Sequence, residues 1–211
     1  GLIDLAEKHG LTILADEVYS DLGFEGAAPL LGALEPDAPI ISFSSLSKAY
    51  LAPGWRVGWL VVGATPRLDG VLTAVMKLAD ARLCSPGPMQ FAVTAALTGD
   101  RSHQVTFRRA LAHRGAITAQ ALNAIPGMRC VPPRAAFYAM PMVSLPPGRT
   151  DEDYVLALLR ETGILCVYGS GFGMPPALGS FRVVFLADPD TLAQIYADIG
   201  AFTRDYLARG G

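Results

Sequence analysis

Short apolar runs that end in polar residues characterise the first third of the chain. The runs LTIL (11–14) and IISFSS (40–45) are followed by Asp16 and Lys48, and a third run, VGWLVV, spans 57–62. Runs of this length fit buried strands, and the mixed connections between them predict a mostly parallel sheet of the α/β class. Ligands of such sheets bind outside the carboxyl ends of the strands, which is where Asp16 and Lys48 stand.

Helical patterns alternate with these runs. The chain opens with the amphipathic pattern GLIDLAEKHG, which ends at Gly10, and further helical patterns span 66–83 and 89–125. The first residue is Gly1 rather than Met, and it already belongs to the helical pattern. We therefore expect a chain that is incomplete at its N-terminus.

A change of composition near Pro126 predicts a second, smaller domain. Thr150 and Asp153 have the spacing of a capping box at the start of a helix, and Gly163 fits its end. The predicted organisation is a first domain of residues 1–125 and a second, α+β domain of residues 126–211. The second domain has expected strands at 128–131, 136–140, 164–168 and 181–186, helices at 151–163 and from Asp188 onward, and a loop rich in Pro and Gly at 141–149.

Composition and charge exclude several classes of protein. The 17 Lys and Arg residues nearly balance the 19 Asp and Glu residues, and no basic run suits nucleic acid. No apolar run reaches the roughly 18 residues of a membrane span, and no signal-peptide pattern opens the chain. Cys84, Cys130 and Cys166 lie far apart without histidine spacings, which argues against a disulfide framework or a metal site. We expect a cytoplasmic protein.

Lys48 is the first candidate for chemistry. An amine at the mouth of an apolar strand is partly desolvated, which favours its neutral, nucleophilic form and suits Schiff-base chemistry. Ser45 and Ser47 offer hydroxyl donors beside it, and Arg56 offers a forked guanidinium that suits a phosphate. The alternative is an ordinary solvated loop lysine.

Asp16 supplies a group of opposite charge. A carboxylate at a strand end can partner a protonated ring nitrogen, and Tyr19 follows three positions later with a phenolic hydroxyl. Asp16 could equally be a cap or turn residue, and Glu17 is an equally good candidate for the carboxylate. Amine, phosphate clamp and carboxylate together match what pyridoxal phosphate needs from a protein.

Arg182 is a candidate in the second domain. It alternates with Val184 and Leu186 along a predicted strand, so it shares a face with apolar side chains and needs a partner. That partner is either an acidic residue in a buried ion pair or the carboxylate of an amino-acid substrate.

Several stretches resemble motifs of one enzyme family. ADEVY, SLSK and GWRVGW resemble, in order and spacing, motifs of the class I/II aminotransferases, which are fold-type I pyridoxal-phosphate enzymes. RLCSPGPMQ, PRAAFYAMP, YGSGFG and GSFRVVFLA resemble later landmarks, most of all those of the alanine-aminotransferase-like branch. The resemblance implies that residues 1–125 are the C-terminal part of the large cofactor domain and that residues 126–211 are the small domain.

The resemblance also implies a role for each candidate residue. Lys48 would hold the cofactor covalently and move the substrate proton, while Asp16 would pair with the ring nitrogen and Tyr19 with the 3'-oxygen. Arg182 would bind the α-carboxylate of the substrate. The residues that would face the phosphate are Ser45, Ser47 and Arg56.

The implied reaction is transamination between an L-amino acid, such as alanine or another small aliphatic donor, and a 2-oxo acid. The implied protein is a homodimer about twice as long as this chain, so the chain by itself is expected to lack activity. Two positions depart from the family pattern: Ala135 stands where glycine is usual, and Tyr168 where proline is common. Both positions belong to loops expected to line the substrate pocket, so they bear on which substrate binds more than on which reaction takes place.

Three alternatives remain open at this point. The same residues suit a C–S lyase or a decarboxylase, since the motifs bind the cofactor and do not select the bond that breaks; Arg182 favours reactions that retain the carboxylate. The second alternative is an aminotransferase-like domain of a transcription regulator. The third is a non-catalytic fragment.

Overall fold

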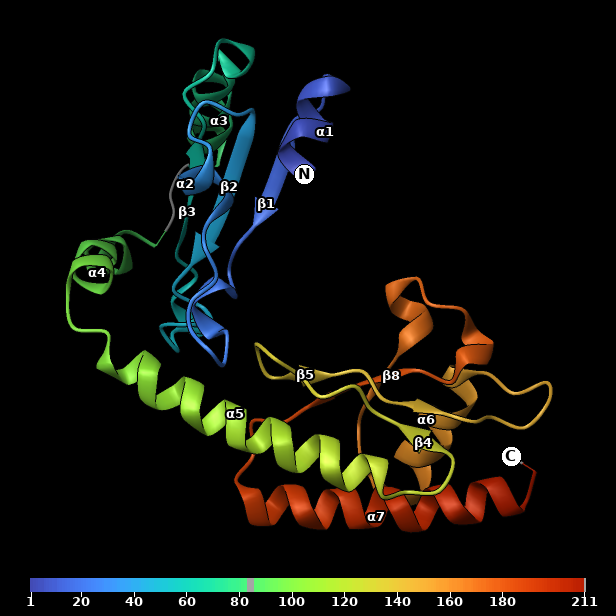
Figure 1. Cartoon of the computed structure of the whole chain (residues 1–211). Coiled ribbons are helices and arrows are strands. Elements are labelled where there is room, and N and C mark those ends of the chain that lie inside the picture. The colour runs from blue at the N-terminus through green and yellow to red at the C-terminus, as the bar shows by residue number, and fades with distance from the viewer. Residues whose placement is uncertain (83–85, 211) are drawn as a thin grey trace. The chain divides into compact units, whose positions relative to one another are not determined.

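The computed structural model describes residues 1–82 and 86–210. Its contacts divide the chain into two compact units, Gly1–Thr106 and Phe107–Gly211. This division falls inside helix α5 (Ser102–Asn123), and the predicted boundary after residue 125 lies just past the end of that helix. Figure 1 labels the helices and strands of both units.

The first unit is built on a three-stranded sheet. Strand β1 (Ile13–Asp16) pairs in parallel with β2 (Ile40–Ser45), and β2 pairs antiparallel with β3 (Gly58–Val62). The α/β class is confirmed. The apolar runs had predicted a mostly parallel sheet, and in the structure one of the two strand pairings is parallel and the other antiparallel. Because residues 46–57 fold into a local loop with no crossover α-helix, β3 returns alongside β2 in the opposite direction.

Two short helices cover one face of this sheet. Ala15, Ala38 and Ile40 are buried, and Ile3 of α1 (Leu2–Lys8) and Leu31 of α2 (Leu31–Leu34) pack against them. This small core fixes the strands whose ends carry the candidate residues. The remaining elements of the unit are η1 (Ser20–Leu22), η2 (Pro53–Trp55), η3 (Pro66–Leu68), α3 (Val71–Ala81) and α4 (Gly87–Thr98).

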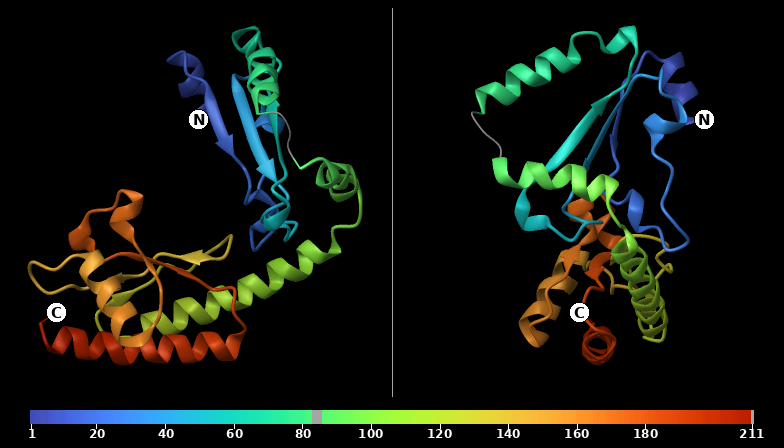
Figure 2. Two further views of the ribbon diagram at one scale, coloured as in Figure 1. Left: turned by 180° about the vertical axis from the view of Figure 1, so that it is seen from behind. Right: turned by 90° about the vertical axis from the view of Figure 1, so that its left-hand side faces the viewer.

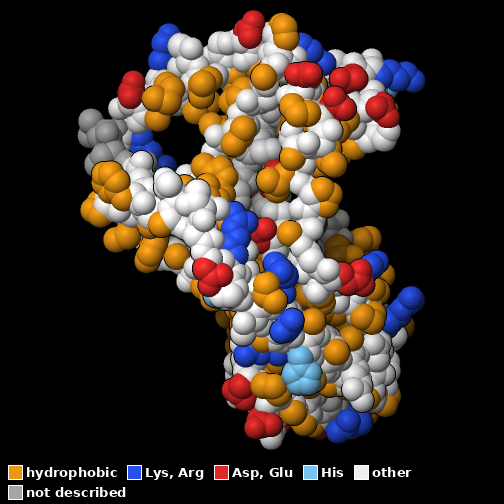
Figure 3. Space-filling model, turned by 60° about the vertical axis from the view of Figure 1, so that its left-hand side comes forward, with side chains coloured by type: hydrophobic (Ala, Val, Ile, Leu, Met, Phe, Trp, Pro, Cys, Tyr) orange, Lys and Arg blue, Asp and Glu red, His pale blue; other side chains and the backbone are white. Residues whose placement is uncertain are grey.

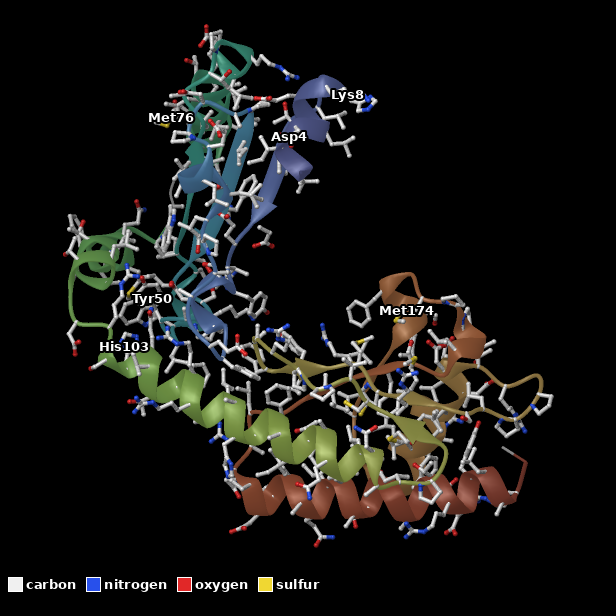
Figure 4. All side chains as sticks on the ribbon, viewed as in Figure 1. Asp4, Lys8, Tyr50, Met76, His103 and Met174 are labelled. Atoms are coloured by element: carbon white, nitrogen blue, oxygen red, sulfur yellow. The ribbon has the colours of Figure 1, made fainter. Side chains whose placement is uncertain are left out.

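The helical pattern predicted over 89–125 is broken at Gly99, so that α4 and α5 are separate helices. Asp100 accepts hydrogen bonds from the backbone N–H and the hydroxyl of Ser102, at 2.9 and 2.5 Å, and so starts α5. The ring of Tyr50 lies 6.1 Å from that of His103 in the first turn of α5 (Figure 4).

Of the helices within residues 1–82 and 86–210, none combines the length and apolarity needed to cross a membrane.

Helices α3 and α4 expose apolar side chains. Figure 3 shows hydrophobic side chains on the surface of the first unit. Phe91 is 86% exposed and Leu78 73% exposed. Exposed apolar surface of this kind is typical of faces that contact another protein segment.

The second unit contains short antiparallel strands and long helices, as the predicted α+β class requires. Helix α7 (Pro189–Ala208) lies alongside the C-terminal part of α5 (Figure 2), where the hydroxyls of Thr118 and Tyr196 are 2.8 Å apart. The strands form a sheet in the order β5 (Tyr138–Ala139), β8 (Phe181–Val184) and β7 (Val167–Tyr168), and a separate pair of β4 (Met128–Arg129) with β6 (Met142–Val143).

The capping prediction for α6 (Asp151–Thr162) is confirmed. Thr150 accepts a hydrogen bond from the Asp153 N–H at 3.1 Å, and the Asp153 carboxylate accepts from the Thr150 N–H at 2.9 Å. Gly163 ends the helix in the left-handed conformation, with φ of 77°. The spacing of Thr150, Asp153 and Gly163 in the sequence was sufficient because a cap is a local structure.

An aromatic cluster holds α6, α7 and β8 together. The buried Tyr154 ring lies 5.3 Å from Phe181, 5.5 Å from Phe202 and 5.4 Å from Tyr206. Its hydroxyl is 2.8 Å from that of Thr203. Because Phe181 belongs to β8, this cluster packs the strand that carries Arg182 against α6 and α7.

Candidate active site

One edge of the first sheet collects the predicted polar residues. Asp16 and Ser45 are the last residues of the parallel strands β1 and β2, so both stand at the same edge. Because β3 is antiparallel, it begins at this edge, with Gly58 opposite Ser45. Arg56, two residues before β3, is therefore brought to the edge where β1 and β2 end.

The loop between β2 and β3 presents Lys48. It is closed by hydrogen bonds from Leu46 N–H to Val57 O and from Ala52 N–H to Leu46 O, both at 3.1 Å. Leu46 and Ala49 are buried, with 1% and 3% of their surfaces exposed, and they anchor the loop on either side of Lys48. The hydroxyl of Ser45 accepts from the Ser47 N–H at 3.2 Å, which tightens the turn before the lysine.

The backbone of this loop is strained at two residues. Leu51 and Arg56 have φ of 56° and 55°, in the left-handed region that favours glycine. The Arg56 guanidinium donates to Pro53 O at 2.9 Å, across the turn η2, and the side chain is exposed. Strain of this kind is found at ligand-binding loops, where the surrounding structure maintains it.

Lys48 lies close to Tyr19. The Lys48 Nζ is 5.7 Å from the centre of the Tyr19 ring, and both side chains are half-buried. Tyr19 precedes η1, where its carbonyl accepts from the Leu22 N–H at 2.9 Å and the fully buried Leu22 fixes the turn. The structure thus brings together two predicted residues that are 29 positions apart in the sequence.

The structure distinguishes Asp16 from Glu17. Glu17 Oε1 accepts from the Leu31 N–H at 2.6 Å and so caps α2. The exposed Asp16 carboxylate accepts from the Val18 N–H at 3.3 Å and borders a hollow of about 420 Å³. Asp16 is therefore the carboxylate that remains accessible to a ligand. The other residues lining the hollow are Leu14, Val18, Phe43, Ser44 and Ser45.

In the second unit, the guanidinium of Arg182 lies close to two aromatic rings. Its guanidinium carbon is 4.8 Å from the centre of the Tyr138 ring and 4.7 Å from that of Phe172. Its Nε is buried without a hydrogen-bond partner, and within residues 1–82 and 86–210 no acidic residue pairs with it. The structural ion pair considered from the sequence is thus not found among the described residues.

Neither Tyr138 nor Phe172 was predicted to have a role beside Arg182. Tyr138 lies 44 positions before Arg182 and Phe172 lies 10 positions before it. Neither contact follows from a local pattern, and the only signal in the sequence is that the stretches AFYAM and YGSGFG contain aromatic residues. Aromatic faces attract a guanidinium and limit its movement, so the two rings hold Arg182 in place.

The two departures from the family pattern have local structural counterparts. The chain after Ala135 passes through Ala136 with φ of 58°. The Tyr168 ring approaches Gly171 so closely that a Cβ there would lie 3.3 Å from it. Residues 83–85 of the stretch RLCSPGPMQ, among them Cys84, lie outside the described residues.

The cysteines of the second unit do not provide a nucleophile. Cys130 and Cys166 are free and buried. Burial raises the pKa of the Cys166 thiol to about 11 and also raises the pKa of Cys130. Both thiols are protonated at neutral pH, and a thiol reacts as its thiolate.

Comparison with known proteins identifies the family. The family described as "Aminotransferase class I and II" matches residues 1–199. An alanine aminotransferase of Mycobacterium bovis is 36% identical over 212 residues, which cover 97% of this chain and 49% of that protein. The glutamate-pyruvate aminotransferase AlaA of Haemophilus influenzae is 32% identical and is matched over 52% of its length.

A solved structure agrees with these matches. The alanine aminotransferase from Pyrococcus furiosus superimposes with a TM-score of 0.88 and 34% identity, over 96% of this chain and 52% of that one. The chain spans about half the length of the relatives it matches. By the family match over residues 1–199, it belongs to the class I and II aminotransferases.

Proposed function

We propose that the protein containing this chain is a pyridoxal-phosphate-dependent aminotransferase that moves an amino group between an L-amino acid and a 2-oxo acid. The observation that carries the proposal is the position of Lys48 beside Tyr19, at the sheet edge that also bears Asp16 and leads to Arg56. The amine, phenol, carboxylate and guanidinium differ in chemistry, and each suits a different part of this cofactor.

The residues present fit pyridoxal phosphate. Lys48 is the amine for its aldehyde, and the accessible Asp16 carboxylate, beside a hollow of about 420 Å³, is the partner for its ring nitrogen. Arg56 and the hydroxyls of Ser45 and Ser47 are the donors for its phosphate. Tyr19 is the donor for its 3'-oxygen.

When bound, the cofactor supplies an aldehyde that takes up amines and a conjugated ring that accepts the electrons of a bond broken beside the nitrogen. The residues of this chain do the rest. The Lys48 amine removes the proton from the α-carbon of the substrate and later returns a proton. The Asp16 carboxylate keeps the ring nitrogen protonated, and the Arg182 guanidinium holds the substrate carboxylate.

Alanine, or a similarly small aliphatic amino acid, is the proposed amino donor, because relatives named alanine aminotransferase and glutamate-pyruvate aminotransferase match the chain. Arg182 supports a substrate that keeps its carboxylate. We also propose a homodimer, from the family resemblance, and a cytoplasmic location, from the absence of disulfide spacing in the sequence.

The test uses the full-length protein and the variant Lys48→Ala. Wild type is expected to bind pyridoxal phosphate with a shifted absorbance band, and borohydride reduction should fix the cofactor on the peptide that contains Lys48. The matched control is Lys77→Ala, because Lys77 is an exposed lysine on α3. An unchanged band in Lys48→Ala, or cofactor fixed on another peptide, would contradict the proposal, and screening amino donors against 2-oxo acids then tests the substrate.

A further inference from the structure

The loop that carries Phe172 is attached to the start of α6 by a buried carboxylate. Asp151, the first residue of α6, is fully buried. It accepts hydrogen bonds from the Ser170 N–H at 2.5 Å and from the Ser170 hydroxyl at 2.9 Å. A third bond comes from the Glu152 N–H at 3.0 Å. No described cation pairs with Asp151, so these donors and the positive end of the helix dipole stabilise its charge.

A second contact fixes the other side of the same loop. Gly169, the first residue of η4 (Gly169–Phe172), donates to Ser180 O at 2.7 Å. A Cβ at Gly169 would meet the Ser180 Oγ at 1.8 Å, so only glycine permits this approach. The Ser180 hydroxyl donates to the sulfur of Met174, labelled in Figure 4, at 3.2 Å. The loop is thus held between α6 and the residue that precedes β8.

The position of this loop decides where the Phe172 ring lies. Phe172 ends the single turn η4 that Ser170 ties to Asp151, and its side chain is half exposed. Its ring is one of the two faces against Arg182, at 4.7 Å. Release of Ser170 would free the turn and remove this face, and the guanidinium would gain rotational freedom.

We propose that Asp151 is a positioning residue for substrate binding, acting through Ser170 and the turn η4 on Phe172, and so on the orientation of Arg182. The inference rests on the proposed function, because it assigns Arg182 to the substrate carboxylate. The α-carboxylate is the part of the substrate that distinguishes an amino acid from a simple amine. A pre-oriented guanidinium binds a carboxylate with two parallel hydrogen bonds and loses less side-chain entropy on binding.

The decisive experiment compares two substrates of the full-length enzyme. Alanine carries the carboxylate that Arg182 binds, and ethylamine is the same molecule without it. In Asp151→Asn, an amide of the same shape loses charge and one acceptor, so Ser170 is no longer held by both of its bonds. We expect kcat/KM for alanine to fall about tenfold, equal to about 1.4 kcal/mol, while the value for ethylamine stays unchanged.

Two further variants keep the test decisive. Ser170→Ala removes only the hydroxyl bond and should lower the alanine value by a smaller factor, even if Asp151→Asn folds poorly. The matched control is Asp188→Asn, since Asp188 is also a carboxylate at the start of a helix, but its hydrogen bonds come from Thr191 of α7, from the N–H at 2.9 Å and the hydroxyl at 2.7 Å. It should leave both substrates unaffected.

Binding gives a readout that does not depend on turnover. Calorimetry with propionate should show weaker binding to Asp151→Asn than to wild type. Equal losses for alanine and ethylamine in Asp151→Asn and Ser170→Ala, or unchanged propionate affinity, would overturn the inference. That outcome is distinct from failure of the proposed function, which the cofactor spectrum of Lys48→Ala reports separately.

Discussion

Leu46 is the most buried residue of the loop 46–57 that carries Lys48, and its truncation is the sharpest test of how this loop is held. Its side chain is 1% exposed, and its backbone makes both hydrogen bonds that close the loop. Leu46→Ala deletes buried methyl groups and leaves a cavity under the loop that carries Lys48. Substitutions of this kind cost about 2–5 kcal/mol.

The loop contains its own control. Leu51 belongs to the same loop but is 53% exposed. Leu51→Ala deletes the same atoms from a side chain that is largely in water, so we expect a cost within about 0.5 kcal/mol. Because Leu51 keeps its φ of 56° in either case, backbone strain does not differ between wild type and this variant.

Urea denaturation of the full-length protein gives the change in stability, and hydrogen exchange of the peptide 46–57 shows whether that change is local. A local loss of about 3 kcal/mol should speed exchange of these amides roughly 100-fold in Leu46→Ala. We also expect weaker pyridoxal-phosphate binding. If the two variants exchange and unfold alike, Leu46 is not the anchor, and burial does not explain how Lys48 is positioned.

Two predictions concern the second unit. Tyr154→Phe keeps the aromatic cluster but removes the hydrogen bond to Thr203, so the free energy of unfolding should fall by about 0.5–1.5 kcal/mol in chemical denaturation; no loss would mean that the bond contributes nothing. Burial raises the pKa of Cys166 from 9.0 to about 11, so its stabilising contribution is complete below pH 9 and is lost as the pH rises toward 11. The contribution is on the order of 3 kcal/mol. The fall in stability over this pH range should be smaller in Cys166→Ala, and equal falls in wild type and variant would contradict the prediction.

The sequence predicted Asp16 and Lys48 as site residues because the pattern that identifies them is local. Each follows an apolar run that ends in polar residues, and the carboxyl ends of parallel strands share an edge. Arg56 required more, because an apolar run does not show in which direction its strand pairs. The antiparallel pairing of β3 brings Arg56 to the same edge, and this pairing follows from how the loop 46–57 closes.

Contacts between distant residues could not be predicted in this way. Tyr138 and Phe172 meet Arg182 only because β5, β8 and the turn η4 come together in the folded unit. Strand β6 was missed because two residues leave no periodic pattern, and the stretch 141–149 around it is rich in Pro and Gly. The choice between Asp16 and Glu17 also needed the structure, since only the contact with Leu31 shows that Glu17 caps α2.

The burial of the Arg182 guanidinium, and the acidic partner that it lacks among the described residues, explain why a substrate carboxylate should bind to it. A half-buried guanidinium with an unpartnered Nε has lost water without gaining an acidic partner among the described residues, and the two aromatic faces offset only part of that cost. A structural arginine in this unit would be expected to show its ion pair, as Arg209 does with Glu161 at 3.0 Å. Arg182 instead keeps a buried Nε that has no hydrogen-bond partner among the described residues. An incoming carboxylate can supply that partner with little reorganisation, and the gain is not available to an amine that lacks the carboxylate.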